Sequence, residues 1–186
     1  MKPISLRRTI LSYVNEGRGI ELSGAARVVV ALIALAMAFY IFRYAFFTVS
    51  NLHLHCAIFL TGMLPVLFLT TSAEASRTER NWVDWVWALA ATLISGYFVY
   101  NWRFYETLIE GVTRISQFET AMSVAMTVVV IEACRRVVGW GLTGVCVLLL
   151  AYVAFGQHLG GALGHDPISL DFYARRITVS DDALFG

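Results

Sequence analysis

The chain has 186 residues, of which 58% are hydrophobic and only 15% are charged, and its formal net charge at pH 7 is +1. Soluble domains are nearer half apolar and a quarter charged, so this composition excludes an ordinary soluble fold. The sequence has no basic run, which indicates no nucleic-acid partner. The three cysteines have neither CxxC nor metal-ligand spacing, so we expect no disulfide framework, no metal site and no cofactor.

Apolar residues come in long blocks, as in helical membrane proteins, since a spanning helix needs about 20 mostly apolar residues. Residues 1–23 are instead polar and basic, and they predict a cytoplasmic segment that forms either an interfacial helix or no fixed structure. A transmembrane helical domain is expected over 24–156. Its five apolar segments are 26–47, 54–71, 82–102, 120–134 and 138–155.

The third of these segments begins and ends with Trp or Tyr, as expected where a helix crosses both headgroup layers. The fourth, 120–134, is short for a span and leaves four or five crossings open; we expect five. Residues 157–186 form a polar tail, expected on the periplasmic side and leading toward a larger subunit. The predicted fold class is all-α, a polytopic membrane helix bundle of four to five transmembrane helices.

The distribution of Lys and Arg predicts which side of the membrane each end of the chain occupies. With a cytoplasmic amino terminus and five crossings, nine of the 14 Lys and Arg residues lie inside and five lie outside. With four crossings the count is again nine against five. The rule therefore predicts a cytoplasmic amino terminus and does not decide the number of spans.

The most unusual stretch is IEACRRVVGW, residues 131–140, which places Glu132, Arg135 and Arg136 between two apolar segments. In one interpretation the two Arg side chains anchor a hairpin to anionic headgroups, and Glu132 pairs with one of them at helical spacing. In another, Glu132 faces a neighbouring helix or a partner subunit, because an ionisable residue inside an apolar helix usually faces protein. Composition and spacing favour the first interpretation.

Four further residues are candidates for a subunit interface or for fixing the topology. Gly139 supplies a flexible point at the bend between the fourth and fifth segments, and Trp140 follows it. Asp84 precedes Trp85 at the start of the third segment. Asp84 either pairs with an Arg across an interface or is a solvated helix-start carboxylate favoured by the helix dipole.

Small residues that allow close helix approach in lipid stand four apart at Ala91 and Ser95 and, as a weaker motif, three apart at Gly141 and Gly144. No segment shows the glycine- or proline-broken half-helices that bind ions and substrates in transporters. Charges within the predicted spans are scarce and lie near segment ends, among them Arg43, Asp84 and Glu132.

The stretch VIEACRRVVGWGLTGVCVLLLAYVAFG resembles a signature of TRAP transporters (tripartite ATP-independent periplasmic transporters), in the branch that uses TAXI-type binding proteins. That family has a Leu-Glu-Ala-Thr-Arg-Arg-like run, then Val-Val-Gly and a helix ending in Tyr-x-x-Phe-Gly. The resemblance covers roughly residues 45–186, with Cys134, Pro167 and Asp182 as departures. The matching residues are Glu132, Ala133, Arg135, Arg136, Val137, Val138, Gly139, Tyr152, Phe155 and Gly156.

The resemblance implies the small membrane subunit, or four-helix unit, of a sodium-driven solute uptake transporter in the bacterial inner membrane. In that family a large elevator-type subunit carries the substrate, a periplasmic TAXI-type protein delivers it, and the small unit braces the scaffold without a substrate site. The implied partners are the large permease subunit, the binding protein and lipid. In fused members the chain continues past its Phe-Gly, whereas this one stops at Gly186, which predicts either separate subunits or a fragment of a fused protein.

Two other functions stay open. A membrane redox protein could bind haem or metal through histidines near the periplasmic side, although no HxxxH or Cys-His spacing supports it. A self-contained small transporter would be expected to show repeat symmetry, which this sequence lacks. Motifs such as GxSxG, HExxH or a P-loop are absent, so we expect no enzymatic activity. The histidines in question are His53, His55, His158 and His165.

Overall fold

The structure of the chain, a computed structural model, contains helices as its regular elements and confirms the predicted all-α fold class. It describes residues 22, 24–47, 52–71, 82–107, 116–160, 164–166 and 168–178. The long helices are α2 (Gly24–Phe46), α3 (Leu52–Thr70), α4 (Trp82–Tyr100), α6 (Gln117–Val138) and α7 (Trp140–Phe155). The short ones are α5 (Trp102–Glu106), η1 (Gly156–His158) and α8 (Leu170–Thr178).

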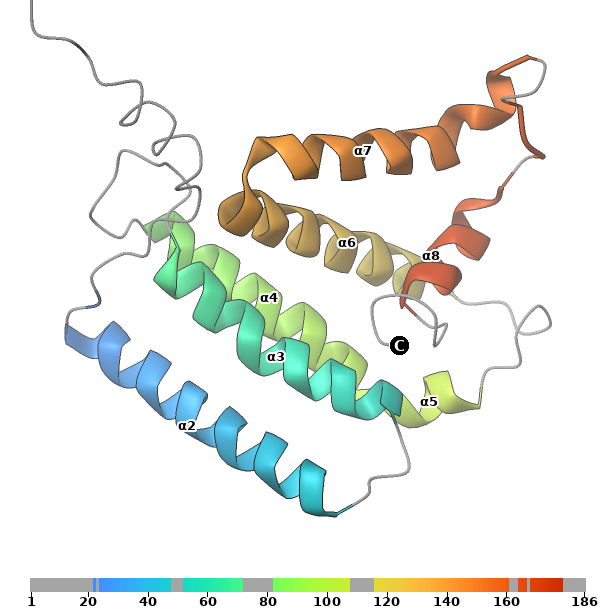
Figure 1. The fold of residues 1–186 in the computed structure, drawn as a ribbon. Helices are drawn as coiled ribbons and strands as arrows, with labels where there is room; N and C mark the ends of the chain where they lie inside the picture. The colour runs from blue at the N-terminus through green and yellow to red at the C-terminus, as the bar shows by residue number, and fades with distance from the viewer. Residues whose placement is uncertain are drawn as a thin grey trace, which may run out of the picture.

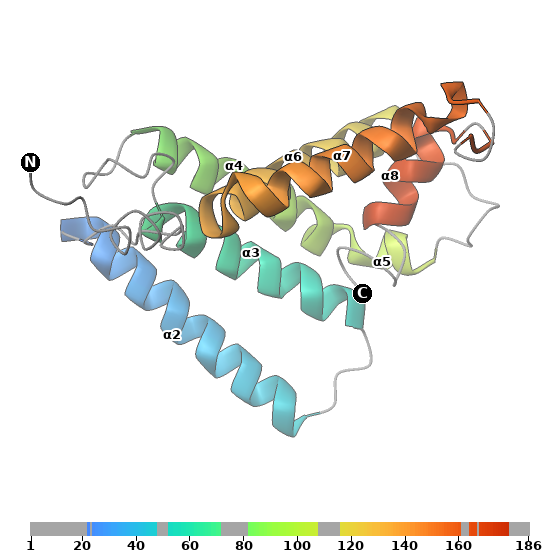
Figure 2. The same ribbon diagram turned by 45° about the horizontal axis from the view of Figure 1, so that its top comes forward.

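Four helices are long and apolar enough to cross a membrane. They cover Gly24–Phe46, His53–Thr70, Trp82–Tyr100 and Trp140–His158. The more polar α6 is not one of these four, but its 22 residues give it a length of about 33 Å at 1.5 Å per residue. It packs against α4 and α7 and runs alongside them (Figures 1 and 2).

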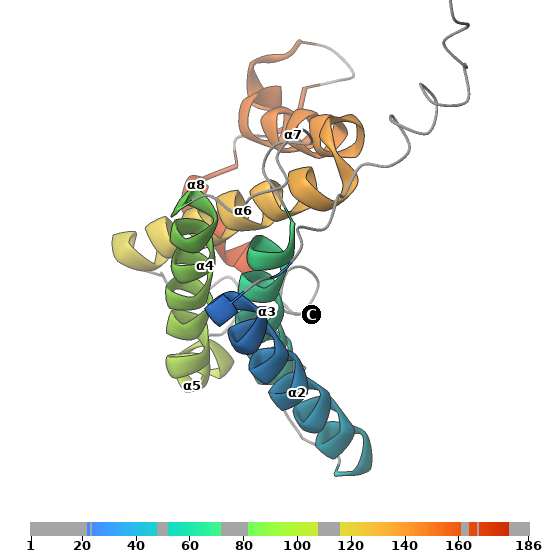
Figure 3. The ribbon, with the colours of Figure 1, turned by 90° about the vertical axis from the view of Figure 1, so that its left-hand side faces the viewer.

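Successive long helices run in alternating directions (Figure 1). The start of α2, the end of α3, the start of α4 and the turn between α6 and α7 therefore lie at the same end of the bundle. Figure 3 shows α2 and α7 on opposite sides of the group formed by α3, α4 and α6. The α3–α4 hairpin is the centre of the packing, and α8 lies across the far end of α6.

Helices α4 and α6 each have a stripe of buried residues, and the two stripes meet where Arg136 contacts Asp84. Residues at spacings of three and four share one face of a helix. The α4 stripe consists of Asp84, Ala88, Ala91, Ser95 and Phe98. The α6 stripe consists of Ser123, Met126, Val129, Ala133 and Arg136. Because the helices are antiparallel, the first residue of the α4 stripe meets the last residue of the α6 stripe.

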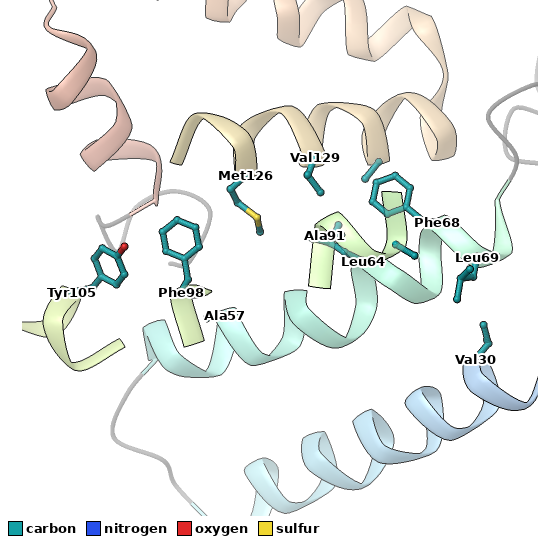
Figure 4. Close-up of a cluster of buried hydrophobic side chains, with 12 residues drawn as sticks. Val30, Ala57, Leu64, Phe68, Leu69, Ala91, Phe98, Tyr105, Met126 and Val129 are labelled. Atoms are coloured by element: carbon teal, nitrogen blue, oxygen red, sulfur yellow. The ribbon is translucent and has the colours of Figure 1, made fainter. Parts of the chain in front are cut away.

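The apolar core lies between these stripes and α3. Figure 4 shows Met126 and Val129 of α6 directed toward Phe68 of α3 and toward Ala91 and Phe98 of α4. Close packing of this kind supplies van der Waals contact, which drives helix association in lipid.

Only some of the small residues expected to permit close approach of two helices lie at a helix–helix contact. Ala91 and Ser95 are fully buried between packed helices, as their spacing predicts. Side chains added at Gly141 and Gly144 would meet open space, so these glycines bring no other described helix close. A Cβ at Gly62 of α3 would instead overlap the side chain of Met37, which makes Gly62 the close contact between α3 and α2.

The helix bounds differ from the expected segments mainly at α6. The expected segment 120–134 lies inside a longer helix that begins at Gln117 because Ser116 and Glu119 form a capping box. In the capping box the Ser116 backbone N–H donates to Glu119 Oε2 at 2.6 Å, and the Glu119 N–H donates to Ser116 Oγ at 3.2 Å. The expected segment 1–23, apart from Leu22, lies outside the described residues, as does the end of the tail, 179–186.

Candidate functional site

Arg136 joins three helices at the end of the bundle that holds the α6–α7 turn. Its side chain is 0% exposed and lies on the last turn of α6. Its Nη1 donates to Asp84 Oδ1 at 2.7 Å and to the Thr71 carbonyl oxygen at 3.3 Å, and its Nε donates to Glu132 Oε1 at 2.8 Å. Its guanidinium carbon lies 4.9 Å from the centroid of the Phe68 ring, a cation–π contact.

Glu132 connects the two adjacent arginines. Both of its carboxylate oxygens accept from Arg135, Oε2 from Nε at 2.7 Å and Oε1 from Nη2 at 2.7 Å. This bidentate geometry is the strong form of the Arg–carboxylate pair. The Arg135 side chain is 19% exposed, and its guanidinium carbon lies 5.4 Å from the centroid of the Trp140 ring. We call Asp84, Glu132, Arg135 and Arg136 the ion-pair cluster.

The ion-pair cluster contains two positive and two negative groups, which allows it to be buried. Taking an ion out of water costs several kcal/mol unless a partner and hydrogen bonds compensate. The Asp84 side chain is only 3% exposed, and Arg136 is its charged partner. Among the described residues, one nitrogen of the cluster, Arg136 Nη2, is buried without a hydrogen-bond acceptor. The removal of either member of this pair would leave the other buried with less compensation for its charge.

Gly139 sets the geometry that brings the cluster and α7 together. Its φ of 87° lies in the region that favours glycine, and its N–H donates to the Arg135 carbonyl oxygen at 3.0 Å, which ends α6. The chain then reverses directly into α7, whose buried Thr143 donates from Oγ1 to Cys134 Sγ at 3.6 Å. The α6–α7 hairpin therefore closes at the cluster.

The structure supports part of each interpretation of residues 131–140. Glu132 pairs within its own helix, as the helical spacing predicts, and it does so with both arginines. Arg136 is buried among helices, so it does not reach headgroups as the favoured interpretation had it. The residue that docks on neighbouring helices is Arg136 and not Glu132, because the last turn of α6 directs it toward α3 and α4.

The other residues predicted for a subunit interface or for fixing the topology lie on different surfaces of the bundle. Asp84 is buried and paired within the chain, so the solvated helix-start alternative is wrong. Trp85, its neighbour in sequence, is 42% exposed and lies on another face of α4. Trp140 is 70% exposed at the α6–α7 turn. Sequence reasoning missed Thr71 and Phe68, which carry no charge or motif that would point to a contact with Arg136.

The histidines make contacts within the chain at the opposite end of the bundle. His55 Nδ1 lies 3.1 Å from Tyr40 Oη, which ties α3 to α2. His165 Nε2 lies 3.2 Å from the Tyr152 carbonyl oxygen. Within the described ranges, no three His, Cys, Asp or Glu side chains are grouped so as to hold a metal ion.

The charged groups of the ion-pair cluster bind one another and so hold helices together. Its carboxylates accept hydrogen bonds from guanidinium groups, so each already has a charged partner. A scan against protein-family models, a search of curated proteins and a search of solved structures each gave no match.

Proposed function

We propose that the chain is the small integral-membrane subunit of a sodium-driven TRAP uptake transporter of the TAXI type, and that it braces the scaffold of the large permease subunit. The chain would lie in the bacterial inner membrane with its amino terminus in the cytoplasm. A periplasmic TAXI-type protein would deliver the solute to the large subunit. The motif at 131–140 is the sequence feature that supports this assignment.

The observation that carries the proposal is the burial of the motif's charges in helix–helix contacts at one end of the bundle. Ionisable groups inside the membrane mark the ion and substrate pathways of transporters. In the described long helices the charged residues lie within about two turns of a helix end, at 3.6 residues per turn. They are Arg27, Arg43, Asp84, Glu119, Glu132, Arg135 and Arg136. This placement supports a bracing role and no solute route through the chain.

The outer helices support the proposed partners. Apolar side chains are exposed along α2 and α7, where lipid or another membrane protein would cover them. On α2 these include Leu32, Leu35, Phe39 and Phe42, and on α7 they include Leu142, Val145, Leu148 and Leu149. A four- or five-helix unit with such faces has the surface that a scaffold subunit and the bilayer require.

The test is sodium-dependent uptake by vesicles that hold either this chain alone or this chain with the large subunit, each supplied with the binding protein. We expect uptake only when both membrane units are present, because this chain provides no route for the solute. Sodium-dependent uptake by vesicles that hold this chain alone would contradict the proposal and would favour a self-contained transporter.

A further inference from the structure

His165 holds the chain that follows α7 against the end of that helix. Its Nδ1 lies 2.7 Å from the Asp166 carbonyl oxygen, and its Nε2 lies 3.2 Å from the Tyr152 carbonyl oxygen. Tyr152 is in the last turn of α7, and its carbonyl also accepts the N–H of Gly156. The imidazole and the Tyr152 ring meet edge-on at a centroid distance of 5.5 Å.

These two contacts require a particular protonation state of His165. A carbonyl oxygen only accepts hydrogen bonds, so a ring nitrogen that bonds to one has to carry a proton. A neutral imidazole has one N–H, whereas the imidazolium cation has two. Only the cation can therefore make both contacts, and the neutral ring would place a lone pair against one of the carbonyl oxygens. A cation at this position also interacts favourably with the carboxyl-terminal end of α7.

Gly156 leaves the space that the imidazole occupies. A Cβ built at this position would lie 2.5 Å from His165 Nε2 and 3.1 Å from Tyr152 Cε2. Any larger residue at position 156 would force the ring away from the Tyr152 carbonyl. The glycine and the histidine therefore act as a pair, although they are nine positions apart.

The contact determines where the chain goes after α7. From residue 166 the chain leads into α8, which packs on α6 with Ala174 buried (Figure 1). Ser169 caps α8, because its Oγ accepts the Phe172 N–H at 3.2 Å. The segment is thus held at two points, by His165 on the end of α7 and by α8 on α6.

The described groups around the ring favour its protonated form. The Asp166 carboxylate is the charged group that acts on it, and Tyr152 is the titratable group that faces it from α7. On η1, His158 makes its own contact, with Nδ1 3.3 Å from the Phe155 carbonyl oxygen. Hydrogen bonds to the carbonyls of Asp166 and then Tyr152 raise the pKa of His165 above its ordinary value, against a smaller opposing effect of desolvation.

We propose that His165 is a pH-sensitive clasp: the protonated ring holds α8 in place relative to the end of α7, and loss of the proton releases the segment between them. A raised pKa means that the folded contact favours the proton. The stabilisation is therefore complete at low pH and is lost as the pH rises through the raised pKa. The clasp acts within this chain, whatever larger assembly contains it.

The test is a distance measurement between spin labels at Leu148 on α7 and Phe172 on α8, both exposed, in lipid nanodiscs from pH 5.5 to 9. The three native cysteines are first replaced by alanine. We expect a narrow distance distribution at low pH that broadens with a midpoint above about 6.5, the ordinary histidine value. A distribution that does not change with pH would overturn the proposal.

Three variants identify the group that titrates. His165→Gln cannot acquire the second proton, so its distribution should stay broad and independent of pH. Gly156→Ala adds no titratable group but displaces the ring, and it should abolish the same transition. His158→Gln is the matched control and should behave as the wild type. Persistence of the transition in His165→Gln, or its loss in His158→Gln, would show that another group is responsible.

Nitrogen-15 NMR of the histidine rings reads the protonation state of the wild-type chain directly, and the His165→Gln variant serves only to assign the signal. In the wild-type chain we expect one imidazole, absent from the His165→Gln spectrum, to carry protons on both ring nitrogens at pH 6 and to lose one with a midpoint above about 6.5. An imidazole that is neutral at pH 6 at this position would contradict the clasp.

Discussion

The two ends of the helix bundle are joined by different chemistry. At the end with the α6–α7 turn, which we call the charged end, the buried Arg136 joins α3, α4 and α6 through ionic hydrogen bonds. At the opposite, aromatic end, rings make the contacts. Tyr97 of α4 meets Phe118 of α6 at a centroid distance of 5.5 Å, and Phe98 of α4 meets Tyr105 of α5 at 5.4 Å.

The aromatic contacts and the buried ion pair contribute differently to the fold: the first add packing energy, and the second favours one register of the helices. Aromatic contacts supply area and van der Waals contact, and they tolerate small shifts between helices. A buried ion pair adds little net stability, but a misaligned one leaves a charge without its partner. We infer that Asp84 and Arg136 act mainly on the register of α4 against α6, because the alignment that pairs them avoids a buried charge without its partner.

The largest effect is expected at the charged end. Arg136→Ala leaves Asp84 and Glu132 buried with less compensation and should lower the free energy of unfolding by about 3–5 kcal/mol. Arg135→Ala is the matched control, since it removes the adjacent arginine from the same Glu132. Because Arg135 is partly exposed, its loss should cost about 1 kcal/mol or less. Chemical unfolding in detergent micelles measures both.

Equal losses for the two arginine variants would contradict the distinction between them. If the proposed function is right, the double variant of Arg135 and Arg136 to Ala should weaken assembly with the proposed large subunit or disturb the topology, without changing substrate preference. Recovery of an intact complex from the double variant at wild-type yield would show that the two arginines are not needed for assembly.

The next effect is expected at the aromatic end. Phe98→Ala removes a fully buried ring and should lower the free energy of unfolding by about 3 kcal/mol, since a cavity remains. Phe98 lies 14 positions from Asp84, or about 21 Å along α4. Its effect should therefore add to that of Arg136→Ala within about 0.5 kcal/mol in a double-mutant cycle. A larger coupling would show that the two ends are not independent.

The smallest effect is expected at the start of α6. Ser116→Ala removes one half of the capping box and should cost about 1 kcal/mol. Ser116→Asp keeps an acceptor at the cap and serves as the control. Hydrogen exchange of the first turn of α6 should rise in the alanine variant alone, and unchanged exchange there would show that packing and not the cap holds this helix start.

The sequence predicts the parts of this fold that depend on local composition. Four of the expected segments coincide with helices that can span a membrane, and the pairing of Glu132 with its arginines follows from helical spacing. The early start of α6 could also have been found, because Ser116 and Glu119 have the spacing of a capping box.

The partner of Asp84 could not be predicted in the same way. Asp84 and Arg136 are 52 positions apart, and their contact depends on the antiparallel packing of α4 against α6. Sequence composition places each charge near a helix end but does not say which ends meet. The buried residues of α4 and α6 show which ends meet only when the two helices are already known to be neighbours. For the same reason the contacts of Thr71 and Phe68 with Arg136 became evident only in the structure.

The identity of the membrane protein that accompanies this chain in its native membrane tests the account most directly. The chain should be purified in mild detergent and the associated polypeptides identified by mass spectrometry. We expect one large multi-spanning permease in a fixed ratio, either as a separate subunit or joined to this chain in one polypeptide. Isolation of this chain with no such permease would contradict the proposal that it is a bracing subunit.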